Sequence, residues 1–234
     1  MGILDGKIAI VTGSGHGIGR GEALELAAQG AKVVINDLGG TAAGEGSDKR
    51  AADDTVGVIT SAGGEAVANY DDVADFGGAE NLIATAYDAF GGLDILVNNA
   101  GIIRDKMIVS MTEEDFDSVL RVHLKGTFAA TKFACIRWRE RSKAGDDVRA
   151  AVVNTVSSAG LQGNVGQANY GSAKAGIAAL TIRLPMPGIA NTASTTTVAA
   201  NSRLNRRLIT VSRLTLTFFR PCRHRIADGD RPLA

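Results

Sequence analysis

Residues 12–19 read T-G-S-G-H-G-I-G, and their position between a strand and a helix decides the fold. The apolar run that ends in this stretch, residues 7–12, predicts a buried strand, and residues 18–29 predict a helix that ends at Gly30. Glycine lets the backbone turn sharply, approach a pyrophosphate closely and pack a helix against the preceding strand. A glycine cluster alone is also typical of a flexible turn, but its place here favours a phosphate-binding turn.

Alternating strands and helices continue outward from this turn. Further strands are predicted at residues 32–36, 65–69, 93–97 and 150–156. Further helices are predicted at residues 51–61, 79–90, 112–133 and 169–182. The glycine-rich residues 39–48 are expected to form a surface loop. Nearly continuous apolar strands separated by helices indicate an α/β fold with a doubly wound, Rossmann-like parallel sheet.

The composition excludes several classes of partner. Lys plus Arg and Asp plus Glu both number 25 in the 234 residues, so neither nucleic acid nor an anionic membrane is expected as a partner. The two cysteines, Cys135 and Cys222, have no motif spacing, which predicts no metal site and favours a reducing compartment. The sequence shows no signal peptide, no apolar run of about 20 residues and no peroxisomal address, so we expect a cytoplasmic protein.

Asp37 ends the second predicted strand, about twenty residues after the glycines. A carboxylate at this position can accept hydrogen bonds from both ribose hydroxyls of adenosine, and its charge repels a 2′-phosphate. The sequence therefore predicts NAD rather than NADP as the cofactor. The alternative is a solvated loop carboxylate.

Tyr170 and Lys174 lie one helical turn apart on one face of the last predicted helix. A free phenol has a pKa near ~10 and is a poor acid–base catalyst at neutral pH, but a neighbouring ammonium favours the phenolate. The spacing alone also fits a surface pair. Here, however, it follows a strand that ends in Ser157 and Ser158, on a chain that carries a dinucleotide turn.

Taken together, these stretches resemble the short-chain dehydrogenase/reductase family. The glycine turn, N-N-A-G at residues 98–101, a serine after the fifth strand and Y-G-S-A-K at residues 170–174 follow one another in the family's order and spacing. The resemblance implies that Tyr170 donates and accepts the proton and that Lys174 assists it and holds the nicotinamide ribose. Ser157, thirteen residues before the tyrosine, would bind the substrate oxygen, with Ser158 as the fallback.

A narrower resemblance joins residues 36–40, 67–71, 121–126 and 163–170 to one branch of this family. That branch contains the (3R)-hydroxyacyl-CoA dehydrogenase domain of the peroxisomal multifunctional β-oxidation enzyme and its bacterial relatives, and it is NAD-linked. The candidate cofactor contacts are Gly13, Ser14, His16, Gly17, Ile18, Gly19, Asp37, Asp72, Val73, Asn99, Ala100, Gly101, Tyr170 and Lys174.

His123 stands where most of the family has an asparagine in its proton relay. An imidazole could take that role, which makes His123 a candidate catalytic residue beside Ser157, Tyr170 and Lys174. The alternative is a core histidine that bonds a backbone carbonyl.

Asp72 and Val73 match positions that contact the adenine in the wider family.

The resemblance ends near residue 182, and a different composition follows. Pro185 and Pro187 are expected to end the helix, and residues 191–205 offer almost no large apolar side chain to bury. We therefore predict a dinucleotide-binding core at residues 1–182 and a poorly ordered tail at residues 183–234.

This tail is not expected to complete the sheet, although residues 208–211 and 214–219 are its best candidate strands. It resembles translation in a shifted reading frame. A truncated relative with a replaced tail is the alternative.

Three functions remain open from the sequence. The first is NAD-dependent interconversion of a secondary alcohol and a ketone, with a 3-hydroxyacyl thioester as the preferred substrate. The second is reduction of a ketoacyl, steroid or quinone-like carbonyl, and the third is a non-catalytic NAD-binding remnant. The family implies a homo-oligomer that acts on a small molecule, although the tail puts the oligomer in doubt.

Overall fold

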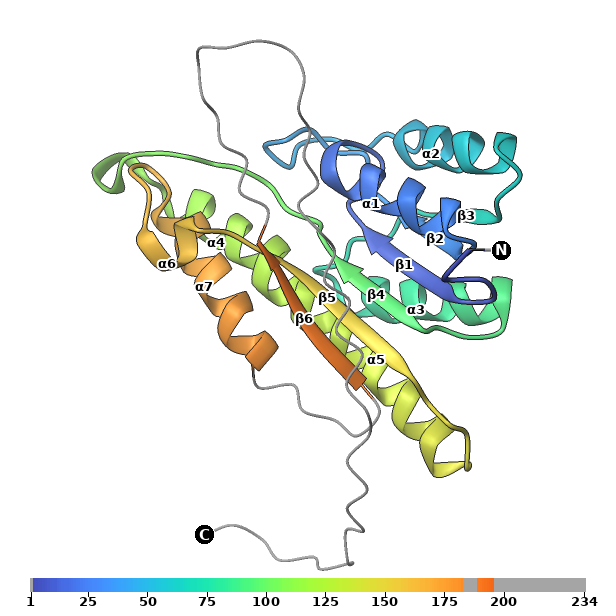
Figure 1. The fold of residues 1–234 in the computed structure, drawn as a ribbon. Coiled ribbons are helices and arrows are strands. Elements are labelled where there is room, and N and C mark those ends of the chain that lie inside the picture. Colours follow the sequence, from blue (N-terminus) through green and yellow to red (C-terminus); the bar gives the residue numbers. More distant parts are fainter. Residues whose placement is uncertain (1, 183–188, 196–234) are drawn as a thin grey trace, which may run out of the picture.

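The computed structural model describes residues 2–182 and 189–195, and it contains one sheet of six parallel strands (Figure 1). The strand order is β3-β2-β1-β4-β5-β6, so the chain runs outward from β1 in one direction and then from β4 in the other. This confirms the doubly wound, Rossmann-like parallel sheet. The strands are β1 (Ile8–Thr12), β2 (Lys32–Asn36), β3 (Ala66–Asn69), β4 (Ile95–Asn98), β5 (Ala150–Val156) and β6 (Ile189–Thr195).

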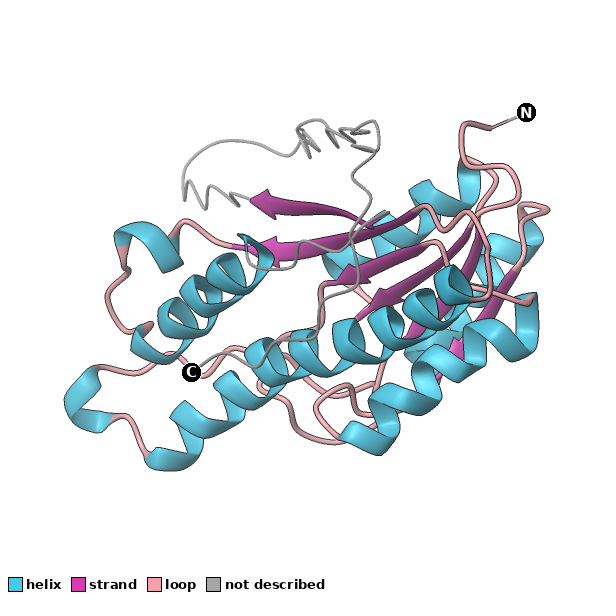
Figure 2. Cartoon of the chain, turned by 90° about the horizontal axis from the view of Figure 1, so that it is seen from below, coloured by secondary structure: helices cyan, strands magenta, loops and turns pink. Residues whose placement is uncertain are grey.

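Helices cover both faces of the sheet (Figure 2). On one face, α1 (Gly17–Ala28) and α2 (Arg50–Ser61) bury Leu26 and Ile59 against strand residues such as Val11 and Ile35. On the other face, α3 (Phe76–Phe90) and α5 (Gly126–Lys143) bury their apolar side chains against residues that alternate with these, such as Ile10 and Leu96. Because successive strand residues point to opposite faces, nearly continuous apolar strands supply both cores.

The segment expected as one helix at residues 112–133 is longer and is not uniform. It consists of α4 (Glu113–Leu120), a π-helical turn η2 (Arg121–Lys125) and α5, which extends to Lys143. The helix extends further because Trp138 is buried in the core and its Nε1 donates a hydrogen bond to Leu93 O at 2.7 Å. The π turn gives the helix an extra residue and turns His123 into the protein interior.

The prediction that residues 183–234 do not complete the sheet is wrong for residues 189–195, which add a sixth strand. β6 pairs in parallel with β5 from Ala150↔Ile189 to Val156↔Thr195, after the crossover helix α7 (Ala168–Ile182). Backbone hydrogen bonds define this pairing, so a strand poor in large apolar side chains can still join it. The candidate strands at residues 208–211 and 214–219 lie outside the described residues.

Two shorter helices complete the described part of the chain. The 3₁₀ turn η1 (Ile108–Ser110) follows β4, and α6 (Ala159–Gln162) follows β5. Within residues 2–182 and 189–195, no helix is long and apolar enough to cross a membrane. In the same residues, no three His, Cys, Asp or Glu side chains gather as metal ligands would.

Candidate active site

Two glycines let the turn after β1 approach the end of β4 closely. A Cβ at Gly13, whose φ is +64°, would lie 2.8 Å from Ala100 Cα. A Cβ at Gly19 would collide with Gly13 O and with the Asn99 side chain. Asn99 Nδ2 in turn donates hydrogen bonds to Thr12 O and Gly13 O, both at 3.1 Å. Glycine is therefore required here by backbone packing.

The outer side of the same turn is open. A Cβ at Gly17, whose φ is +55°, would meet no atom within 4 Å, and His16, Gly17 and Ile18 are exposed. His16 is the N-cap of α1, and its side chain makes no capping hydrogen bond to the first turn of the helix. This is the arrangement that a pyrophosphate needs. Ser14, by contrast, is buried, and its hydroxyl donates to Val11 O at 2.7 Å, so its side chain holds the turn.

Asp37 lies beside the turn, at the carboxyl end of β2. Its Oδ2 accepts a hydrogen bond from Gly15 N and its Oδ1 accepts one from Gly39 N, both at 2.7 Å. Each carboxylate oxygen keeps a further lone pair, so the group can still accept hydrogen bonds from ribose hydroxyls. The glycine turn and Asp37 together fit the adenosine and pyrophosphate part of a dinucleotide.

Asp72 and Val73 follow β3 and lie in different surroundings. Val73 is buried in the core, where its side chain leaves no room for a Cβ at Gly126. Asp72 is partly exposed, and its Oδ2 forms an ion pair with Arg121 at 2.8 Å. Arg121 is a contact that the sequence analysis missed, because no spacing rule links an arginine of η2 to an aspartate after β3.

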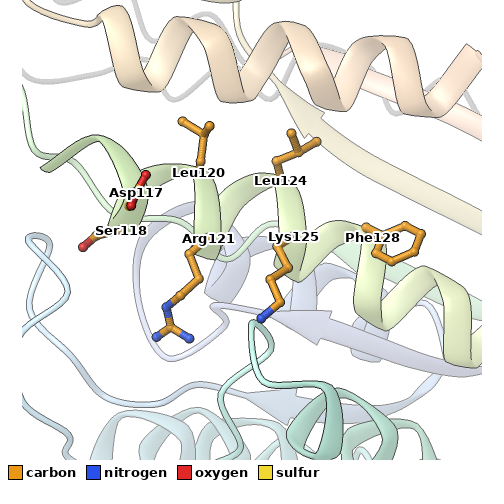
Figure 3. A pocket seen from close by; sticks show the side chains of 7 residues that line it. All are labelled: Asp117, Ser118, Leu120, Arg121, Leu124, Lys125 and Phe128. Carbon is orange, nitrogen blue, oxygen red and sulfur yellow. The ribbon is translucent and has the colours of Figure 1, made fainter. Parts of the chain in front are cut away.

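The chain is also hollowed along α4, η2 and α5 (Figure 3). Leu120 and Leu124 extend to one side of this hollow, whereas Arg121 and Lys125 extend to the other. None of the residues predicted for catalysis or for the cofactor lines it. Its link to the candidate site is Arg121, which holds Asp72.

Tyr170 and Lys174 lie on the first turns of α7, with the lysine ammonium 5.5 Å from the centre of the phenol ring. Lys174 is buried, and its Nζ donates a hydrogen bond to Thr155 O of β5 at 2.7 Å. Burial lowers the pKa of Lys174 to about 8. The pair is thus fixed to the sheet from its lysine end.

Ser157 follows β5 directly, and its Oγ accepts a hydrogen bond from Ala159 N at 3.2 Å. The turn that carries it packs against α7, because a Cβ at Gly160 would lie 2.6 Å from Ala175 N. The structure therefore brings the Ser157 turn onto the helix of Tyr170. Ser158 is the N-cap residue of α6 and makes no side-chain capping bond.

His123 is buried beside this pair. Its ring meets the ring of Tyr170 edge-on, with centroids 5.2 Å apart. Nε2 lies 2.8 Å from Ile102 O and 3.1 Å from Ile102 N, whereas Nδ1 has no hydrogen-bond partner among the described residues. Burial and, secondly, the charge of Lys174 lower the pKa of His123 to about 3, so the imidazole is neutral. A Cβ at Gly101 would collide with this ring.

Asn169 is a second residue that the sequence analysis missed. It is fully buried, and its Nδ2 donates to Arg104 O at 2.9 Å and to Asp115 O at 3.0 Å. Its Oδ1 accepts a hydrogen bond from Tyr170 N at 2.8 Å. An asparagine at the start of a predicted helix is a recognisable capping residue, but its partners 54 and 65 positions away could not be read from the sequence.

Comparison with known proteins shows which family the chain resembles. The family model described as short chain dehydrogenase matches residues 7–199, a span that includes β6. The chain is 47% identical over 205 residues to peroxisomal multifunctional enzyme A of Dictyostelium discoideum, covering 87% of this chain and 44% of that protein. It is 48% identical over 181 residues to hydroxyacyl-CoA dehydrogenase ChsB1 of Mycobacterium tuberculosis, covering 76% of this chain and 56% of that protein.

A solved structure gives the same result at the level of the fold. The crystal structure of a short chain dehydrogenase from Mycobacterium avium superimposes with a TM-score of 0.77 at 53% identity, covering 82% of this chain and 70% of that one. The chain spans about half the length of the two curated relatives. With its glycine turn, its parallel sheet and the match over residues 7–199, the chain belongs to the short-chain dehydrogenase family.

Proposed function

We propose that the chain is an NAD-dependent oxidoreductase that interconverts a secondary alcohol and a ketone, with a 3-hydroxyacyl thioester as its substrate. The observation that carries this proposal is the Tyr170–Lys174 pair on α7, which lies next to the turn that carries Ser157. The printed names of the multifunctional enzyme and of the hydroxyacyl-CoA dehydrogenase support the acyl thioester. Asp37, beside the glycine turn, supports NAD over NADP.

In the oxidation, Tyr170 accepts the proton of the substrate hydroxyl while Ser157 holds the same oxygen by a hydrogen bond. The buried ammonium of Lys174 lies 5.5 Å from the centre of the Tyr170 ring, so its positive charge is beside the phenol that takes part in the proton transfer. His123 stays neutral and adds no positive charge beside Lys174. When NAD is bound, its nicotinamide supplies the acceptor for the hydride that leaves the carbinol carbon.

The same groups can work in the opposite direction, which keeps a carbonyl reductase for ketoacyl, steroid or quinone-like substrates as the second candidate. A non-catalytic remnant that binds NAD is the third. Self-association and a cytoplasmic location also remain predictions, which size-exclusion chromatography and cell fractionation would test.

The test is a panel assay that follows formation of NADH and NADPH. We expect NADH to form with (3R)-3-hydroxyacyl-CoA substrates, and we expect less product with the (3S) isomers, with steroid alcohols or with NADP. Turnover of steroid or quinone-like carbonyls alone would favour the reductase. NAD binding without any turnover would favour the remnant, and absence of NAD binding would overturn the proposal.

A further inference from the structure

Residues 39–48 form a compact loop whose two ends meet beside Asp37. A Cβ at Gly39 would collide with the backbone of Asp48, so the loop closes on itself like an Ω-loop. Two internal hydrogen bonds, from Thr41 N to Glu45 O and from Gly44 N to Thr41 O, both at 2.8 Å, shape its tip. The loop therefore has a defined conformation that its own hydrogen bonds hold.

The tip of this loop binds the segment that follows β4. Ile103 N donates a hydrogen bond to Ala42 O at 2.9 Å, and the Arg104 guanidinium donates one from Nε to Ala43 O at 3.0 Å. A Cβ at Gly44 would lie 3.6 Å from Ile102 Cβ. In Figure 1 the loop extends from the end of β2 toward this segment.

The sheet order places these contacts across the cofactor edge. β1 lies between β2 and β4, so a loop that joins the end of β2 to the segment after β4 crosses the carboxyl end of β1. The glycine turn begins at that end, and dinucleotides bind outside the carboxyl ends of the strands at such a switch point. A dinucleotide that reaches from Asp37 to Gly101 must therefore pass the loop.

We propose that residues 39–48 are a strap that closes over the bound dinucleotide and must open for its exchange, with Arg104 as the latch. The proposal rests on the proposed binding of NAD. Arg104 suits this role because its side chain is only 17% exposed and is held from α4 by Glu114 at 3.0 Å. Gly39, Gly44 and Gly46 have positive φ values of 76°, 83° and 76°, so these positions can absorb the backbone change of opening.

A reversible disulfide tests the strap directly. The Gly44→Cys/Ile102→Cys double variant, built in a Cys135→Ser/Cys222→Ser background, places two Cβ atoms at a separation within the ~3.5–4.5 Å of disulfides. Because any side chain at Gly44 is strained at its φ of +83°, the same double variant with its thiols reduced is the reference. After oxidation with NADH bound, we expect the rate of NADH release into excess NAD, followed by fluorescence, to fall at least tenfold, and a reductant to restore it. An unchanged rate in protein whose thiols are shown to be oxidised would overturn the strap.

Removal of the latch should speed NADH release instead of slowing it, and this test does not depend on the disulfide. Arg104→Met keeps the apolar stem but removes the donor to Ala43 O, and loss of a hydrogen bond from a charged group predicts release that is roughly tenfold faster. Arg149→Met is the matched control, because Arg149 pairs with Asp147 at the surface just before β5.

The outcomes separate the strap from the proposed function. A parent chain that binds no NADH would overturn both. A parent chain that binds NADH, with release unchanged by Arg104→Met or equally changed by Arg149→Met, would overturn the strap and leave the cofactor assignment in place.

Discussion

The glycine turn and the Tyr170–Lys174 pair lie at the same edge of the sheet, but different forces hold them in place. The turn is fixed by backbone packing so close that no Cβ fits at Gly19. The pair is fixed by buried polar groups, since Lys174 bonds a β5 carbonyl and a neutral His123 packs against the tyrosine ring. The turn should thus be insensitive to pH and intolerant of a side chain at Gly19. The side that we propose to be catalytic should respond to pH, because its packing depends on a neutral His123.

Tyr170→Phe should break the catalytic side and leave the turn intact. Because the ring still packs against His123 but can no longer move a proton, turnover should fall by ~10²–10⁴-fold, the usual contribution of acid–base catalysis. Steady-state kinetics with a hydroxyacyl-CoA and NAD measure the loss, and NADH fluorescence titration should give a nearly unchanged Kd. A variant with near-normal turnover would remove Tyr170 from the acid–base role.

Gly19→Ala should break the turn and leave the catalytic pair in place. The new Cβ would collide with Gly13 O and the Asn99 side chain, and overpacking of this kind costs about 1–3 kcal/mol. We therefore expect NAD affinity to fall by roughly tenfold to a hundredfold.

Gly21→Ala is the matched control, since it lies on the same helix and a Cβ there would meet nothing within 4 Å. It should bind NAD normally and raise the free energy of unfolding slightly, because alanine is the better helix former. Equal losses of affinity in both variants would show that backbone packing does not hold the turn.

The same contrast explains what the sequence could and could not predict. The turn was predictable because its conformation requires glycine at particular positions, and these glycines can be read directly from residues 12–19. β6 was missed because its pairing with β5 is a matter of backbone register, and residues 189–195 carry no run of large apolar side chains. The π turn was missed because an extra residue within a helix leaves the surrounding periodicity almost unchanged.

In the candidate site, too, local features could be predicted from the sequence and long-range contacts could not. Tyr170 and Lys174 share one helix face, so their proximity could be predicted from spacing. The contacts of Arg104 with Ala43 and of Arg121 with Asp72 join segments 61 and 49 residues apart, and only the fold brings them together. A resemblance between motifs cannot predict such contacts, because it compares residues at matching positions and not residues that touch in space.

His123→Gln sharpens the comparison through pH. The pKa of His123 is lowered from 6.5 to about 3 in the folded chain, so the unfolded chain binds the extra proton first as the pH falls. The contribution of neutral His123 to the free energy of unfolding is therefore fully present above pH 6.5 and is lost as the pH falls toward 3. At pH 5 the loss amounts to about 2 kcal/mol.

Urea unfolding at pH 7.5 and pH 5 measures this loss of folding stability. The free energy of unfolding of the parent chain should fall by about 2 kcal/mol more than that of His123→Gln between the two pH values. An equal fall in both proteins would mean that His123 is not held neutral in the folded chain.

Asp37→Ser should give the smallest effect and tests whether the turn side also chooses the cofactor. The carboxylate accepts hydrogen bonds from Gly15 N and Gly39 N, and in the proposed complex it also accepts them from the adenosine ribose. Its loss should weaken NAD binding about tenfold, within the range for a hydrogen bond to a charged group. NADP binding should weaken less or improve, because the repulsion of the 2′-phosphate is removed. Asp37→Asn keeps the shape but not the charge, so it should relax the discrimination while disturbing the turn less. If both variants keep the parent's preference for NAD, Asp37 serves only to hold the turn, and the choice of cofactor must come from another residue.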